Sequence, residues 1–175
     1  MTSTHGLKHL FPIPVYWSHV ENFVSIQNEI TKGIEQTNFG MRKDWGNTHY
    51  LSDPTFQENF LVKYNCNNFL SELETHLQRY TSESLKVTQS WAALFKQYNY
   101  GHIHDHLPSD MAGVYYYKTK GSTGNLFFQS PQSYDSRCNI ESKEGLLLLF
   151  PACLKHGITQ NTTDTERISI SFNLT

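Results

Sequence analysis

Four residues in one short run could do chemistry: His102, His104, Asp105 and His106. A fifth, His156, follows 50 positions after His106. On an extended backbone, alternate side chains point to opposite faces, so the three histidines of the run face one way and Asp105 faces the other. Same-face neighbours are roughly 6.6 to 7 Å apart along a strand, which allows two imidazoles to converge on one ion with bonds of ~2.1 Å. Two of the three can therefore share a metal.

His156 stands in a context that suits a third ligand. It follows the apolar segment 146–150 and immediately precedes Gly157. A single histidine beside an apolar strand is more often a core residue with satisfied hydrogen bonds, and an HxHxH run is often only polar surface. Because His156 is followed by a glycine and a strand with a polar face, it can instead supply a ligand from a different strand.

The segment 167–173 alternates without a break between polar and apolar residues. This pattern predicts a strand, and its ordinary interpretation is a half-exposed antiparallel strand with the polar face in solvent. The functional interpretation is that the polar face lines a cavity. There the Arg167 guanidinium and the Ser169 hydroxyl, two residues apart, could clamp a carboxylate by charge-assisted hydrogen bonds.

The elements that must position these residues fall into two regions. Helical spacing of apolar residues predicts a helix over 18–37 and a second helical region from Phe60 that ends near Tyr80. Short aromatic and β-branched runs separated by turns then predict strands. The expected strands are residues 85–98, 112–119, 125–129, 145–150, 155–159 and 166–174. Helices followed by strands indicate an α+β domain, mainly β, with helices packed on one face of a sandwich or barrel, and they disfavour a parallel βαβ fold.

Composition narrows the class of protein further. The 14 Lys and Arg against 16 Asp and Glu give a formal charge of −2 without a dense basic cluster, so nucleic acid and anionic membranes are poor candidate partners. Three widely spaced cysteines indicate neither a disulfide framework nor a zinc knuckle. Residues 1–13 lack the apolar run of a signal peptide. We therefore expect a cytoplasmic, single-domain protein over 1–175, with helical support over about 18–80 and a β core over about 85–175.

Three motifs, taken in order, resemble a known family. They are HDHLPSDMAGVYYY at 104–117, GNLFFQSP at 124–131 and GLLLLFPACLKHGITQNTTDTERISISFN at 145–173. The region from Trp91 to Asn173 looks like the 2-oxoglutarate/Fe(II)-dependent oxygenase superfamily. More narrowly, it is similar to the small oxygenases of the prolyl-hydroxylase-like branch found in marine bacteria and their viruses. Residues 10–16 also look like the opening strand of that group. The resemblance implies a double-stranded β-helix, a jelly-roll or cupin-like fold.

The resemblance assigns roles residue by residue. It implies that His104, His106 and His156 hold Fe(II), with His156 as the distal ligand. Arg167, eleven positions after His156, corresponds to the basic residue that binds the far carboxylate of 2-oxoglutarate, and Ser169 completes an RxS pattern. Tyr116, one of three consecutive tyrosines, resembles a tyrosine that contacts the same carboxylate, with its identity open by one position.

One departure from the family pattern concerns the second ligand. Most of the superfamily has HxD or HxE, which gives two histidines and one carboxylate. Here the second position is His106, and no HxD can be built because Ile103 stands two residues before Asp105. Two arrangements remain open: a three-histidine site, or a bend that brings Asp105 inward. His102 is a further possible replacement.

The implied activity is a dioxygenase reaction that uses O2 and couples decarboxylation of 2-oxoglutarate to hydroxylation of a C–H bond. The resemblance favours a prolyl or other peptidyl substrate, and a free amino acid or other small molecule is an alternative. There are two alternative hypotheses for the function. The first is a catalytically silent β-helix interaction module, for instance in a viral particle. The second is a cupin-like three-histidine metal enzyme that does not use 2-oxoglutarate. The sequence does not distinguish a monomer from a homodimer.

Overall fold

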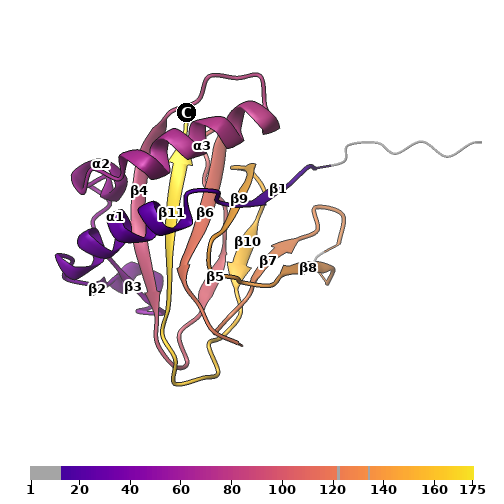
Figure 1. The fold of residues 1–175 in the computed structure, drawn as a ribbon. Helices are drawn as coiled ribbons and strands as arrows, with labels where there is room; N and C mark the ends of the chain where they lie inside the picture. The colour runs from indigo at the N-terminus through magenta and orange to yellow at the C-terminus, as the bar shows by residue number, and fades with distance from the viewer. Residues whose placement is uncertain (1–12, 122, 134) are drawn as a thin grey trace, which may run out of the picture.

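The computed structural model describes residues 13–121, 123–133 and 135–175, which form two antiparallel sheets and a helical layer (Figure 1). The large sheet has the strand order β1-β9-β6-β11-β4-β3-β2, and the small sheet has the order β5-β10-β7-β8. In chain order the elements are β1 (Tyr16–His19), α1 (Phe23–Glu35), β2 (Gly40–Met41), a 3-10 helix (Lys43–Trp45), β3 (Tyr50–Leu51), α2 (Phe60–Lys63), α3 (Asn67–Tyr80), β4 (Val87–Phe95), β5 (Gly101–His104), β6 (Met111–Lys118), β7 (Leu126–Gln129), β8 (Arg137–Ile140), β9 (Leu146–Pro151), β10 (His156–Ile158) and β11 (Arg167–Leu174).

The sheets and helices stack in three layers. Figure 1 shows α1 and α3 lying across one face of the large sheet, while the small sheet covers part of the other face. One apolar cluster joins the helices to the large sheet, and a second cluster fills the space between the two sheets. This mainly β architecture, with its helices on one face, is the double-stranded β-helix with helical support that the sequence predicts, and the prediction is confirmed.

The apolar run of β9 follows from its position between two cores. Leu147 and Leu149 face the helices, and Leu146 and Leu148 face the small sheet, with all four at most 5% exposed. A strand buried on both faces needs no polar alternation, which is why this run is apolar throughout. β9 therefore ties the helical layer to the layer that carries His156.

Both predicted helices are shorter in the structure. The first begins at Phe23 instead of residue 18, because Ser18 and His19 pair with Leu147 and Leu146 in the large sheet. The second region divides into α2 and α3 around Asn65, whose φ of 53° ends the first piece, and α3 ends at Tyr80 as predicted. Neither α1 nor α3, the longest helices of the described ranges, has the length and hydrophobicity that a membrane crossing requires.

The six predicted strands are present with shifts of a few residues at their ends. The largest shift is at the first of them, which ends at Phe95, so that Tyr98 lies in a turn at φ 68° and is 66% exposed. The short strands β2, β3, β5 and β8 were not among the predicted six. Of the opening segment 10–16, only Tyr16 belongs to a strand, and residues 10–12 lie outside the described part of the chain.

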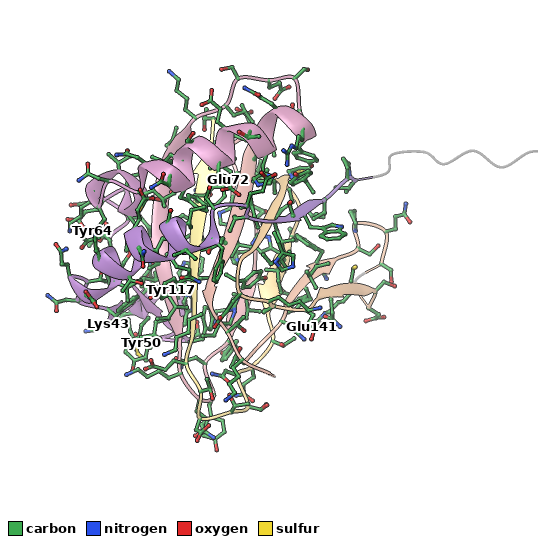
Figure 2. The ribbon with its side chains drawn as sticks, viewed as in Figure 1. Lys43, Tyr50, Tyr64, Glu72, Tyr117 and Glu141 are labelled. Atoms are coloured by element: carbon green, nitrogen blue, oxygen red, sulfur yellow. The ribbon has the colours of Figure 1, made fainter. Side chains whose placement is uncertain are left out.

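Two glutamates fasten α1 and α3 to each other. Neither N-cap side chain, of Asn22 or of Cys66, bonds its own helix. Instead Glu72 of α3 accepts hydrogen bonds from the backbone N–H groups of Glu21 and Asn22 at the start of α1 (Figure 2). Glu29 of α1 in turn accepts from the N–H groups at the start of α3. Each helix thus supplies the anion that the other helix's N-terminus favours.

We expect Glu72→Ala to lower the free energy of unfolding by about 2 kcal/mol, because it leaves partly buried N–H groups and the buried Nε2 of His76 without their acceptor. Urea denaturation monitored by circular dichroism measures the change. Glu74→Ala, an exposed position two residues along the same helix, is the matched control and should change stability by less than about 0.5 kcal/mol. Equal losses in the two variants would contradict the capping role.

Candidate metal centre

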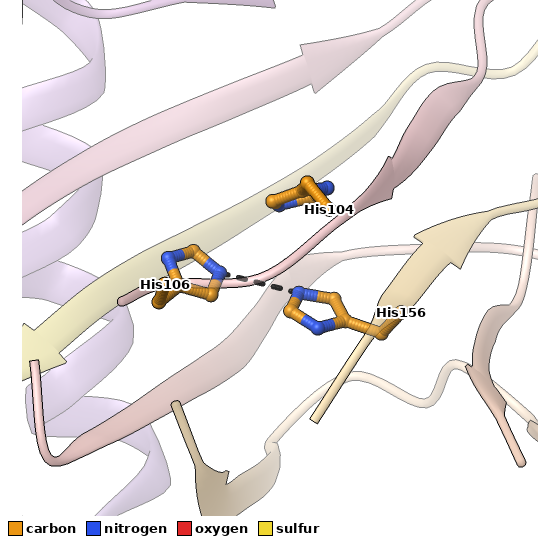
Figure 3. Close-up of side chains that lie close together, drawn as sticks. All are labelled: His104, His106 and His156. Atoms are coloured by element: carbon orange, nitrogen blue, oxygen red, sulfur yellow. Dashed lines mark hydrogen bonds between the residues drawn. The ribbon is translucent and has the colours of Figure 1, made fainter. Parts of the chain in front are cut away.

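Strand pairing brings the three histidines together. His156 begins β10 and lies directly opposite His104, the last residue of β5, and His106 follows two residues later. One nitrogen of each ring lies within 4.8 Å of the corresponding nitrogens of the other two. Figure 3 shows the rings of His106 and His156 facing one another, with His104 beside them. Two segments separated by about fifty residues therefore form one cluster.

Hydrogen bonds to the backbone fix two of the rings. Nδ1 of His104 lies 2.8 Å from the carbonyl oxygen of His102, and Nδ1 of His156 lies 2.8 Å from that of Leu154. Since a carbonyl only accepts, both Nδ1 atoms carry the proton and both Nε2 lone pairs are free. Nε2 of His106 lies 3.2 Å from Nε2 of His156. Two ligands of one ion at ~2.1 Å are about 3.0 to 3.4 Å apart for right-angled to tetrahedral geometry, so this pair suits one metal ion.

The protein environment keeps the cluster neutral. Burial lowers the pKa of His106 to about 3, and the neighbouring His156 and His104 lower it as well. Burial and then His104 lower the pKa of His156 to about 4, and burial lowers the pKa of His104. Neutral imidazoles are the form that binds a metal, so at neutral pH the cluster is ready to accept a cation.

The other residues of the His-rich run lie outside the cluster. The ring of His102 is exposed and contacts Tyr100 edge-on, with 5.1 Å between ring centroids. The Asp105 carboxylate accepts a hydrogen bond from the N–H of Leu107 and is not among the clustered groups. Of the arrangements that the sequence leaves open, the structure therefore forms the three-histidine one.

Arg167 is fully buried with no anion beside it. Its exposed fraction is 0%, and none of its three guanidinium nitrogens has a hydrogen-bond partner among the described residues. The guanidinium carbon lies 4.9 Å from the ring centre of Phe95 and 5.1 Å from that of Tyr116. Burial lowers its pKa, but arginine remains a cation in proteins. A buried, unpaired charge is costly, so this position calls for an anionic ligand.

Of the two further residues expected to contact the co-substrate, Tyr116 and Ser169, Tyr116 lies beside this cation. Tyr116 packs in the apolar cluster between the sheets, whereas Tyr115 belongs to the cluster under the helices, which selects Tyr116 among the consecutive tyrosines. Ser169 pairs with Tyr116 across the sheet. The hydroxyls of Tyr116 and Ser169 are buried without a partner among the described residues. Ser171, not Ser169, contributes to the cavity wall beside Arg167.

An inner cavity joins the guanidinium to the histidines. It holds about 40 Å³ and is lined by Arg167 and by all three clustered histidines, among other residues. A second hollow of about 270 Å³, here called the outer groove, is lined by Trp45, Phe56, Gln89, Trp91, His104, Asp105, His106, Leu107, Pro108, Ser109 and Asn173. His104 and His106 belong to both walls. The inner cavity and the outer groove therefore meet at these two histidines.

Two residues that line this site, His49 and Trp45, were not among those predicted from the sequence. His49 is 7% exposed, stacks on Phe95 with centroids 4.6 Å apart, and lines the inner cavity. Burial lowers the pKa of His49 to about 4, with His104 and Arg167 as further causes. Trp45 lies 5.0 Å from His104, ring to ring. Both stand in a polar stretch without helical or strand periodicity, so only the folded chain reveals them.

Two aromatic residues that precede the His-rich run, Trp91 and Tyr98, differ in their positions. Trp91 is 8% exposed and stacks on His106, with ring centroids 5.8 Å apart. It lines both the inner cavity and the outer groove. Tyr98, by contrast, is exposed and contributes to neither wall.

The fold and the cluster together define the class: a double-stranded β-helix with three clustered histidines that could hold a metal ion. Residues 89–173 match the family described as "Putative 2OG-Fe(II) oxygenase". A search of curated proteins returned no match. The narrower branch suggested by the sequence remains a prediction.

Solved structures with the same fold are distant in sequence. An oxidoreductase of the 2OG-Fe(II) oxygenase family from Burkholderia pseudomallei is 9% identical with a TM-score of 0.70, over 91% of this chain and 84% of that one. HygX from Streptomyces hygroscopicus, solved with nickel and 2-oxoglutarate bound, is 10% identical with a TM-score of 0.70 over 93% and 82%. A Pseudomonas putida prolyl-4-hydroxylase is 13% identical with a TM-score of 0.63 over 93% and 92%. At these identities the likeness establishes the fold.

The lowered histidine pKa values predict a pH-dependent stability of the metal-free protein. In the unfolded chain a histidine takes up its proton near 6.5, but in the folded protein His156 and His106 do so only near 4 and 3. Between these limits the unfolded state binds more protons, so the stabilisation present above pH 6.5 is lost as pH falls. Each group should contribute up to about 1.4 kcal/mol per pH unit in this window.

Urea denaturation of the metal-free protein between pH 7.5 and 4.5 measures this dependence. The double variant His106→Asn with His156→Asn should show a shallower loss of stability than the unsubstituted chain. His102→Asn, at an exposed position outside the cluster, is the control and should keep the original slope. Identical slopes in all three proteins would show that the cluster does not titrate as described.

Proposed function

We propose that this protein, as one domain over residues 1–175, is an Fe(II) oxygenase that uses 2-oxoglutarate and O2. The observation that carries the proposal is the pairing of a neutral histidine cluster with an uncompensated buried cation across one cavity. A dicarboxylate that binds the metal at one end and Arg167 at the other satisfies both. The match of residues 89–173 to the oxygenase family supports the same proposal.

The residues present fit a divalent iron ion. His104, His106 and His156 would hold it through Nε2. Imidazole suits Fe(II) as well as zinc, copper and nickel, so the donor set permits iron without selecting it. Selectivity would then come from the co-substrate and the reaction.

The orphaned polar atoms fit the far carboxylate of 2-oxoglutarate. Arg167 supplies charge-assisted N–H donors, and Tyr116 and Ser169 add buried hydroxyls that lack partners among the described residues. The inner cavity, at about 40 Å³, joins Arg167 to the three histidines.

Iron(II) bound in this class of site supplies O2 activation, coupled to decarboxylation of 2-oxoglutarate to succinate and CO2 and to oxidation of a substrate C–H bond. The chain's own residues orient the co-substrate and exclude bulk water. Arg167 fixes one end of the co-substrate, and the apolar walls of Phe150 and Phe95 keep bulk water from the inner cavity. The outer groove, with Trp45 and Trp91 on its walls, is where the substrate would meet the centre.

We propose hydroxylation as the reaction and a peptidyl side chain as the substrate, with proline as the residue that the family resemblance favours. The Pseudomonas prolyl-4-hydroxylase, which has the same fold, supports this choice. A small molecule is the alternative substrate, and HygX, solved with hygromycin B bound, supports that one. The proposed location is the cytoplasm, and nucleic acid and membranes are not proposed as partners.

The two alternative functions account for different features of the site. A cupin-like three-histidine enzyme without 2-oxoglutarate is favoured by the histidine donor set, but it leaves the buried guanidinium of Arg167 without an anion. A silent interaction module has no use for three neutral, convergent imidazoles. The oxygenase proposal accounts for both features together.

Anaerobic addition of Fe(II) and then 2-oxoglutarate should produce the weak visible charge-transfer band of a metal chelate. In Arg167→Ala, we expect 2-oxoglutarate to bind about 100-fold more weakly or worse, since a buried charge partner is removed, while Fe(II) affinity stays within about threefold. Succinate production should be lost. Band titration, succinate assay and iron binding measure the three quantities.

Arg79→Ala is the matched control, because Arg79 is an exposed arginine on α3 whose partner is Glu21. It should leave iron binding, 2-oxoglutarate binding and succinate production unchanged. Unchanged succinate production in Arg167→Ala would remove the 2-oxoglutarate assignment. Absence of Fe(II) binding by the unsubstituted protein would favour the silent module.

A further inference from the structure

Two side-chain amides form a chain of hydrogen bonds at the wall of the outer groove. Asn173, near the end of β11, pairs with Gln89 of β4. Nδ2 of Asn173 donates to Oε1 of Gln89 at 3.0 Å, and Nε2 of Gln89 donates to the backbone carbonyl of Phe56 at 3.1 Å. Because a backbone carbonyl can only accept, it fixes which end of Gln89 is the oxygen, and Gln89 then fixes the orientation of Asn173.

The remaining oxygen of Asn173 is buried and unused. Oδ1 has no hydrogen-bond partner among the described residues, and the residue is 9% exposed. Asn173 and His106 lie together in the wall of the outer groove. Burial lowers the pKa of His106, whereas the Asn173 side chain acts in the opposite direction, as an acceptor facing an imidazole N–H does. A buried acceptor thus stands beside a ring that needs one.

His106 differs from its two neighbours in how its ring can be held. His104 and His156 donate from Nδ1 to backbone carbonyls, and the hydrogen bonds of the described residues give His106 no such carbonyl. Its Nε2 faces His156, which leaves Nδ1 to be anchored. Trp91, two residues after Gln89 on β4, stacks on the ring and limits its tilt, but stacking does not select the tautomer.

We propose that Asn173 is a positioning residue for His106: its Oδ1 accepts the Nδ1–H of His106, and Gln89 holds Asn173 in the orientation that makes this possible. All three imidazoles then carry their proton on Nδ1 and present Nε2 to one ion. This inference rests on the metal site of the proposed function and is independent of 2-oxoglutarate. Acceptors behind a metal-bound histidine fix its orientation and raise its basicity.

The test compares Asn173→Leu, Asn173→Asp and Gln89→Leu with the unsubstituted protein. Long-range ¹H–¹⁵N NMR of the metal-free protein reports the tautomer of His106, and anaerobic titration reports Fe(II) affinity. Asn173→Leu, which has similar volume but no acceptor, should give a mixed tautomer and bind Fe(II) 10- to 100-fold more weakly. Asn173→Asp keeps an acceptor and should retain the Nδ1–H form and affinity within about threefold.

Gln89→Leu leaves Asn173 in place but frees its amide to turn, so it should weaken Fe(II) binding several-fold and mix the tautomers. This variant also keeps the test decisive if Asn173→Leu does not fold. Gln36→Leu, at an exposed amide on the far end of α1, is the control and should change neither readout. Circular dichroism and thermal denaturation establish that each variant is folded.

The proposal is overturned if a folded Asn173→Leu, or a folded Gln89→Leu, keeps both the Nδ1–H tautomer of His106 and the original Fe(II) affinity. Failure of the proposed function has a different signature. In that case the unsubstituted protein fails to bind 2-oxoglutarate, or binds neither 2-oxoglutarate nor iron, and the tautomer of His106 in the metal-free protein still responds to Asn173. The NMR measurement needs neither metal nor co-substrate.

Discussion

The site depends on one backbone register: His156 of β10 opposite His104 of β5. Directly opposed residues of an antiparallel pair carry their Cβ atoms about 5 Å apart, which places two imidazoles within reach of a common ion. A slip of one residue would turn His156 to the other face of its strand. β10 is held on its other edge by β7, with His156 opposite Phe128. The position of the third ligand is thus fixed from both sides of a three-residue strand.

Packing between the two sheets stabilises this register, because it buries the side chains around His156. The small sheet packs on the large one through the apolar cluster that includes Phe150 and Phe128, and both rings contact the ring of His156. The helices contribute from a distance: by covering the opposite face of the large sheet they allow β9 and β11 to be buried on both sides. Burial on both sides is also what removes water from around Arg167. The same packing therefore positions the ligands and creates the demand for an anion.

The sequence patterns predict many of the strands and several of the residues proposed for the site, and the reasons can be identified. Period-two alternation in 167–173 placed Arg167 and Ser169 on one face, and the apolar run of β9 marked a strand buried on both sides. The patterns failed where tertiary contacts override local preference. The predicted helix starts at Ser18, but in the structure Ser18 pairs with β9. The helical pattern after Phe60 does not reveal the turn at Asn65. His49 and Trp45 show no periodicity, because Trp45 ends a short 3-10 helix and His49 lies in a bend just before a two-residue strand.

The choice between histidine and carboxylate at position 106 changes the charge of the proposed centre. With one carboxylate ligand, a divalent ion and its ligands would have a net charge of one positive unit. With three neutral imidazoles, both positive charges of the ion would remain. Arg167 adds a further cation in the same low-dielectric cavity, with no acidic group of the described residues paired to it. Like charges so placed repel strongly, and an incoming dianion relieves that repulsion at both ends. Metal and dicarboxylate are therefore expected to favour each other's binding, since each lowers the electrostatic cost that the other would meet alone. In a centre with a carboxylate ligand this mutual dependence would be weaker, because the protein itself would already supply part of the negative charge.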